Sequence, residues 1–205
     1  MEPLDPTEVR VLGALLEKEI TTPEYYPLTL NALVNACNQK SNRDPVVSYE
    51  EEVVQQALAL LRNRGLAVRI SGAGHRVEKY AHSLGEKLNL RRPEVAVLCV
   101  LMLRGPQTVG EVRGRTERMY EFAELADVEH CLESLAARAP EPLVVALPRG
   151  RWGQLLGGVP DPSHNAPEAQ ALDPHKSDFA ERVAALEREV AELKQTLESF
   201  RRQFE

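Results

Sequence analysis

An internal repeat is the feature of this sequence that most restricts its fold. Leu4, Glu8, Val9, Val11, Leu12, Leu15 and Thr22 recur 86 positions later as Leu90, Glu94, Val95, Val97, Leu98, Leu101 and Thr108. A second offset, of 74 positions, matches Val54, Leu58 and Leu61 with Val128, Leu132 and Leu135. Similarity over this length is typical of a duplicated supersecondary unit. The difference between the offsets predicts about a dozen extra residues in the first copy.

The first copy begins with three predicted helices. Asp5 as cap, Pro6 at the first helical position and Glu8 at the third predict a helix that runs to about residue 19. Apolar residues at helical spacing predict a second helix over 29–37. Ser48 followed by Glu51 predicts a capping box at the start of a third helix, and Gly65 is a natural stop signal for it.

A β-hairpin follows the third helix of each copy. Alternating apolar and polar residues predict strands over 66–71 and 77–80, joined by a glycine-rich tip at 72–74. In the second copy, 143–147 and 151–156 flank a turn at 148–150. A third helix that ends in a hairpin is typical of a winged helix-turn-helix. The sequence therefore predicts an α+β, mainly helical fold with two tandem winged helix-turn-helix domains, over 1–83 and 84–157.

The C-terminal part of the chain has a different pattern. Residues 158–178 are rich in Pro, Gly and polar side chains and predict a flexible linker. Residues 179–205 carry a heptad seam that predicts a coiled-coil helix and a homodimer. The residues predicted to form the dimer contact are Val183, Leu186, Val190, Leu193, Leu197 and Phe200. An amphipathic helix that folds back on its own domain is the alternative.

Two long segments resemble a known protein family. The runs YYPLTLNALVNACNQKSNRDPV, over 25–46, and LCVLMLRGPQTVGEVRGRTERM, over 98–119, resemble the YceH family of uncharacterised bacterial proteins. The resemblance covers about residues 4–156 and implies a tandem winged-helix fold. It implies no particular activity, because no biochemical role is established for the family.

Composition restricts compartment and partner. The longest apolar run, 95–103, is far shorter than the ~20 residues that a membrane span needs. No secretory signal precedes the first helix. Three widely spaced cysteines in apolar contexts are typical of reduced thiols. We therefore expect a cytoplasmic protein. Net charge is −6, of which −4 lies in residues 161–205. The two predicted domains lack the strong basic footprint of a typical nucleic-acid-binding protein.

Candidate binding residues are polar or cationic side chains of loops, third helices and hairpins. The loop between the second and third helices supplies amides and cations, and Gln and Arg on the third helix can hydrogen-bond to base edges. The candidates are Gln39, Lys40, Asn42, Arg43, Gln55, Arg62, Arg69, Arg76, Arg113, Arg115, Arg118, Arg149 and Arg151. Each set has a simpler interpretation as a turn, a solvated surface or an intrahelical salt bridge.

The sequence contains no catalytic or metal-binding spacing that we recognise, so we expect no enzymatic activity, cofactor or metal. Two functions remain, and a winged helix that senses a small molecule is a third, for which the sequence shows no pocket. One is a dimer that binds duplex DNA as a regulator. The other is a protein-interaction scaffold, which the acidic run 50–52 at the start of the third helix favours, because carboxylates and phosphates repel each other.

Overall fold

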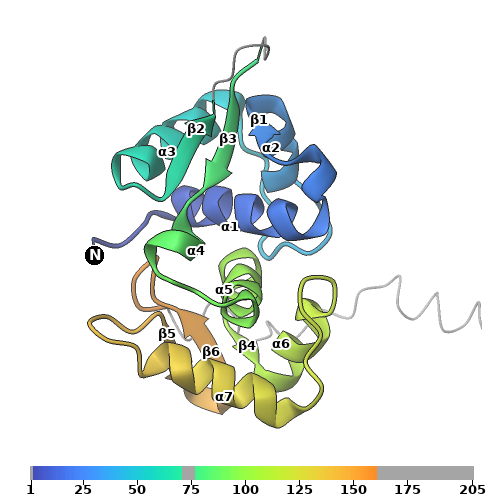
Figure 1. The fold of residues 1–205 in the computed structure, drawn as a ribbon, viewed down its shortest axis with the longest axis vertical. Helices are drawn as coiled ribbons and strands as arrows, with labels where there is room; N and C mark the ends of the chain where they lie inside the picture. Colours follow the sequence, from blue (N-terminus) through green and yellow to red (C-terminus); the bar gives the residue numbers. More distant parts are fainter. Residues whose placement is uncertain (1, 71–76, 161–205) are drawn as a thin grey trace, which may run out of the picture. The chain divides into compact units, whose positions relative to one another are not determined.

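The computed structural model of the chain describes residues 2–70 and 77–160, and these form an α+β fold in which helices predominate (Figure 1). The first repeat contains α1 (Pro6–Thr21), η1 (Pro23–Tyr25), β1 (Leu28–Thr29), α2 (Leu30–Cys37), α3 (Glu51–Asn63), β2 (Ala67–Ile70) and β3 (Lys79–His82). The short α4 (Leu84–Lys87) leads to the second repeat. That repeat contains α5 (Arg92–Arg104), β4 (Gln107–Thr108), α6 (Val109–Thr116), α7 (Leu125–Ala136), β5 (Val144–Leu147), η2 (Pro148–Gly150) and β6 (Arg151–Gln154).

Both repeats build the same small antiparallel sheet. The strand orders are β1-β3-β2 and β4-β6-β5, so in each sheet the last strand of the hairpin lies in the middle. Leu28 is opposite Tyr80 in the first sheet, and Gln107 is opposite Trp152 in the second. The same elements in the same order confirm the internal repeat.

The structure corrects one match within that repeat. Thr108 caps α6 by accepting a hydrogen bond from the Glu111 amide at 3.3 Å. The residue that does this for α2 is Thr29, which accepts from the Ala32 amide at 3.3 Å. Thr29, and not Thr22, is therefore the counterpart of Thr108. The extra residues of the first repeat fall partly before α2, around η1, and partly in the loop between α2 and α3.

The start of α3 is also corrected. The helix begins at Glu51, its cap is Glu50, and neither Ser48 nor Glu51 forms the predicted capping box. The reason lies in the preceding loop, where Asn38 holds the Tyr49 backbone from both sides. Its Nδ2 donates to the Tyr49 carbonyl and its Oδ1 accepts from the Tyr49 amide, both at 2.8 Å. These bonds keep Tyr49 in an extended segment, so the helix starts later.

Other helix ends follow their local signals. The Asp5 carboxylate accepts from the Glu8 amide at 2.8 Å, and the Glu8 carboxylate accepts from the Asp5 amide at 2.9 Å. At the end of α3, Gly65 has a φ of 64°, and the amides of Gly65 and Leu66 donate to the carbonyls of Arg62 and Leu61. This pair of bonds is a Schellman motif, which favours glycine at its left-handed position.

Helices α1 and α5 lie side by side between the other elements of the two repeats (Figure 1). Residues Glu8–Glu17 of α1 and Glu94–Leu103 of α5 are buried on all sides of their helices. Gly13 marks their closest approach, because a Cβ on it would lie 2.9 Å from Leu103 Cδ2 and 3.2 Å from Met102 Cβ. The Cys99 thiol donates to the Gly13 carbonyl at 3.5 Å. Since Cys99 is the repeat counterpart of Gly13, this contact indicates an approximate two-fold relation between the repeats.

Backbone hydrogen bonds also join the repeats. The Leu4 amide donates to the Leu156 carbonyl at 2.7 Å, and the Asp44 amide donates to the Leu103 carbonyl at 2.9 Å. Buried apolar residues of both repeats belong to one continuous core. Residues 2–157 therefore pack around one shared core, although they contain two repeats.

Several predictions concern residues outside the described part of the chain. The linker at 158–178 falls there apart from its first three residues, and so does the whole coiled-coil helix at 179–205 with its proposed dimer contact. The hairpin tip with Arg76 lies outside as well. Within residues 2–70 and 77–160, no helix combines the length and apolarity that crossing a bilayer requires.

Replacing Gly13 tests the helix crossing. We expect Gly13→Val to lower the free energy of unfolding by about 1–3 kcal/mol, because its side chain meets Leu103 and Met102. Gly114→Ala in α6 is the matched control, since nothing lies within 4 Å of its Cβ and alanine favours the helix, by up to ~1 kcal/mol. Urea unfolding of both variants measures the difference. Equal stabilities would contradict the close crossing.

Candidate functional site

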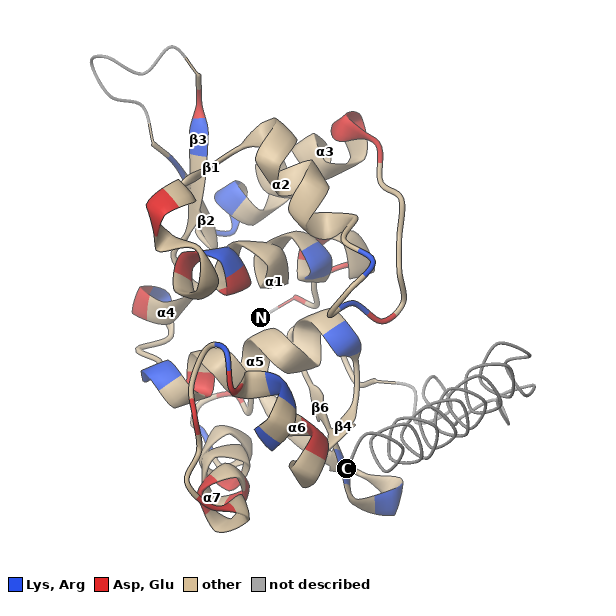
Figure 2. Cartoon of the chain, turned by 90° about the vertical axis from the view of Figure 1, so that its right-hand side faces the viewer, with Lys and Arg blue, Asp and Glu red and all other residues tan. Residues whose placement is uncertain are grey.

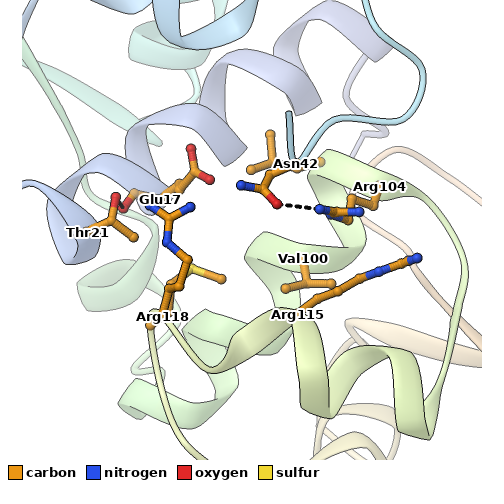
Figure 3. Close-up of a pocket in the computed structure, with 9 residues that line it drawn as sticks. Glu17, Thr21, Asn42, Val100, Arg104, Arg115 and Arg118 are labelled. Carbon is orange, nitrogen blue, oxygen red and sulfur yellow. Dashed lines mark hydrogen bonds between the residues drawn. The ribbon is translucent and has the colours of Figure 1, made fainter. Parts of the chain in front are cut away.

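Polar residues from both repeats surround a small pocket between α1, the loop before α3, α5 and α6. We call it the junction notch and define it by its polar lining, which is Glu17, Thr21, Asn42, Arg104, Arg115 and Arg118 (Figure 3). Val100, Leu103 and Met119 complete the wall. The notch has a volume of about 30 Å³. It contains the densest group of guanidinium groups in the described residues.

A buried ion pair forms one side of the notch. Arg43, whose side chain is fully inaccessible, donates to both carboxylate oxygens of Glu17, at 3.2 and 2.7 Å. Arg43 also donates to the Ala36 carbonyl at 2.8 and 3.2 Å. Burial alone raises the pKa of Glu17, but the hydrogen bonds and charge of Arg43 outweigh it and leave that pKa below its usual value. Glu17 is therefore ionised and fully engaged.

The loop over 38–45 is held by further contacts. Gln39 Oε1 accepts from Lys18 at 3.3 Å and from Arg43 at 3.2 Å. The Arg10 guanidinium donates to the carbonyls of Cys37 and Pro45. Burial and the nearby charge of Arg43 lower the pKa of Arg10. These bonds fix the loop on α1, so the loop supports the fold as well as forming part of the surface.

Three arginines of the second repeat complete the notch. Arg104 donates to Asn42 Oδ1, which links the repeats directly. Arg115 forms an ion pair with Glu111 at 3.3 Å on its own helix. Arg118 is exposed and has no hydrogen-bond or ion-pair partner in the part of the chain that the structure describes. Burial, followed by repulsion from Arg115 and Arg43, lowers the pKa of Arg104. The positive charge here thus exceeds what the neighbouring carboxylates neutralise.

The structure sorts the predicted binding residues into three groups. Asn42 of the first repeat meets Arg115 and Arg118 of the second at the notch, and Gln39 and Arg43 lie behind it, where Arg43 bonds to Gln39 and to Glu17. The expectation that Arg43 is a surface cation of its loop is corrected, since only its exposed neighbour Lys40 remains on the surface. The physical reason is the buried Glu17 carboxylate, which requires a cation beside it.

Other candidates have structural partners. Arg113 donates to the carbonyls of Phe122 and Ala123, at 3.3 and 2.8 Å, and so closes the loop before α7. Arg151 donates to the Pro106 carbonyl at 2.9 Å. Arg69 pairs with Glu78 at 2.6 Å across the hairpin.

The remaining described candidates lie on the outer surface, away from the notch. Gln55 and Arg62 are exposed on α3, and Arg149 is exposed in the turn before β6.

The third helices of the two repeats present acidic surfaces. α3 starts with Glu51 and Glu52 after Glu50, and Arg62 near its end is its only cation. α7 contains Asp127 and two glutamates but no Lys or Arg. Figure 2 shows the acidic segments at the start of α3 and along α7. α3 also exposes Val53 and Leu60, to 39% and 44%.

The described residues show few groups suited to catalysis. Cys37, Cys99 and Cys131 are buried free thiols. Burial raises the pKa of Cys37 to about 12 and that of Cys131 to about 11, so neither is a ready nucleophile. Among the described residues, no group of three His, Cys, Asp or Glu side chains is arranged to hold a metal ion.

Comparison with known proteins identifies the family. Residues 4–152 match the family described as "Protein of unknown function, DUF480". The chain is 55% identical to a UPF0502 protein of Solibacter usitatus over 98% of both chains. It is 53% identical to a UPF0502 protein of Citrifermentans bemidjiense, over 92% of this chain and 88% of that one. The chain therefore belongs to this family of bacterial proteins, as its resemblance to the YceH family indicated.

Sequence reasoning did not identify Glu17 and Thr21 as part of the site. One signal was present. The apolar run over 95–103 has no polar side, which is typical of a helix buried all round. Its repeat partner α1 must then be buried too, so that the charges of Arg10 and Glu17 need buried partners.

The Glu17–Arg43 pair can be tested by its effect on stability. We expect Arg43→Met to cost about 3–5 kcal/mol at neutral pH, because it leaves the Glu17 carboxylate buried without its partner. Lys40→Ala, which removes an exposed cation of the same loop, should change stability by less than about 0.5 kcal/mol. Urea unfolding measures both. A small cost for Arg43→Met would show that the pair does not hold the loop.

The same pair predicts a pH dependence. Because the pKa of Glu17 is lowered in the folded protein, its stabilising effect is complete above the ordinary value of 4.5. The effect is lost as the pH falls through the lowered folded-state pKa. The wild type should therefore lose more stability on acidification below 4.5 than a Glu17→Gln variant, as measured by urea unfolding at a series of pH values.

Proposed function

We propose that the chain is a tandem winged helix-turn-helix protein that acts as a non-enzymatic protein-interaction adaptor. Each repeat contributes three helices, a β-hairpin and a short strand before the second helix that completes a three-stranded sheet. This order of elements supports the winged-helix assignment, with α3 and α7 as the third helices and β2–β3 and β5–β6 as the wings. The family itself has no described function, so the proposal rests on the surfaces of this chain.

The acidic start of both third helices is the observation that carries the adaptor proposal. In helix-turn-helix proteins that bind DNA, residues near the N-terminus of the recognition helix contact base edges. Here that end carries Glu50, Glu51 and Glu52 in the first repeat, and Glu124 and Asp127 in the second. Insertion into a groove would bring these carboxylates between phosphate chains, where like charges repel. Neither helix is suited to groove reading.

The exposed surface of α3 indicates the chemistry of the partner. Val53 and Leu60 lie two helical turns apart and therefore on one side of the helix. Their exposed apolar area adjoins the carboxylates at the start of the helix. A protein surface with an apolar centre and basic rim would match this arrangement, because apolar contact supplies affinity and charge complementarity supplies orientation.

Two aspartates on this surface test the adaptor proposal. We expect a Val53→Asp/Leu60→Asp variant to bind its protein partner at least ~30-fold more weakly, since central apolar contacts typically contribute 2 kcal/mol or more. Gln55→Asp adds a charge on the same helix outside the apolar stripe and is the matched control. Affinity purification identifies the partner, and calorimetry with the purified pair gives the affinity. Undiminished binding by the double variant would refute α3 as the contact.

A DNA-binding regulator is the second candidate function. It is favoured by the cations that gather at the junction notch and by Arg149 in the second wing, which can contact phosphates without inserting a helix. Its test is an electrophoretic shift assay with duplex DNA at about 50 mM salt, where even non-specific contacts are strong. The adaptor proposal expects no shift. A shift that weakens steeply with salt would favour the DNA-binding function instead.

A further inference from the structure

The arginines of the junction notch carry more positive charge than their neighbours in the fold neutralise. Arg104, Arg115 and Arg118 all line one small pocket, with Arg43 behind it. Arg118 has no partner among the described residues, and burial followed by repulsion from Arg115 and Arg43 lowers the pKa of Arg104. A fold gains nothing from such repulsion by itself. The arrangement is explained if a negative group completes it.

Glu17 and Glu111 do not fill this role. Both oxygens of Glu17 accept hydrogen bonds from Arg43, and Lys18 lies 3.5 Å from one of them. Glu111 caps α6 through Thr108 and pairs with Arg115 and with Arg151, so it neutralises only one arginine of the notch and shares its charge with another outside it. In Figure 3, Arg118 extends toward Glu17 and Thr21 from one side of the opening, while Arg104 lies near Asn42 on the other. The space between is open to a small ligand.

We propose that the junction notch binds the phosphate group of a small molecule, either inorganic phosphate or a small phosphate monoester, through Arg104 and Arg118, which lie on its two sides (Figure 3). Guanidinium groups suit this ligand because their planar N–H donors match pairs of phosphate oxygens. Asn42 and Thr21 offer further polar atoms at the rim. This site is separate from the adaptor surface on α3 and does not depend on it.

The size of the notch selects the ligand. The volume of about 30 Å³ leaves room for only a small part of a ligand. A monoester would therefore insert its phosphate and leave the rest of the molecule outside. Because Thr21 and Asn42 belong to the first repeat and the arginines to the second, the bound group would contact both repeats. Binding should then stabilise their association.

Titration with inorganic phosphate tests the proposal on the full-length protein. At constant ionic strength, we expect saturable binding by calorimetry and a rise in the thermal midpoint that chloride does not cause. Arg118→Gln should weaken binding roughly tenfold or more, because it removes a charged donor without breaking any contact among the described residues. Arg104→Gln should weaken it similarly. Arg92→Gln, at an exposed position at the start of α5, is the control and should bind like the wild type.

Three outcomes would overturn the proposal. The first is no saturable binding by the wild type at about 10 mM phosphate. The second is equal binding by the wild type and both notch variants. The third is binding of a short DNA duplex that requires Arg118 while inorganic phosphate does not bind, which would assign the notch to a nucleic-acid backbone. All three leave the α3 variants of the adaptor test unaffected, so the two proposals fail independently.

Discussion

The close crossing of α1 and α5 at Gly13 is the contact on which the rest of the structure depends. With no side chain at Gly13, the Cys99 thiol reaches the opposite backbone, and Leu103 and Met102 pack directly against α1. Each helix then has its own repeat on one side and the other repeat on the remaining side. This explains why both helices are buried all round, a condition that a separate three-helix unit with a hairpin would not impose on its first helix.

Burial of α1 has an electrostatic consequence. Glu17 lies on a helix surrounded by protein, where an unpaired carboxylate is costly. The loop before α3 supplies Arg43 as its partner and is thereby anchored against the second repeat, which its Asp44 amide and Asn42 side chain also contact. The arginines of the second repeat that line the notch lie next to this loop. The positive notch is therefore a product of the way the repeats pack, and neither repeat contains it alone.

The outer surfaces and the notch differ in charge and therefore suit different partners. The third helices carry carboxylates where a DNA-reading helix needs cations or neutral donors, whereas the notch concentrates arginines in a space suited to one small anion. A protein partner outside and a phosphate at the junction are compatible with each other. If both bind, the anion would act on the joint between the repeats and so on the relative presentation of the two acidic helices. Membership of a family without a described function makes these surfaces the most direct guide to its role.

The sequence by itself determined the elements and their duplication. The capping box at Asp5 and Glu8, the stop at Gly65 and the alternating strands are local signals, which depend on residues close together in the chain. The start of α3 was misplaced because Asn38, eleven residues away, holds Tyr49 out of the helix. The partnership of Glu17 with Arg43, and the meeting of Asn42 with Arg104, join residues 26 and 62 positions apart. Only the tertiary structure could decide these, because the first contact depends on how the loop before α3 folds onto α1, and the second on how the two repeats pack against each other.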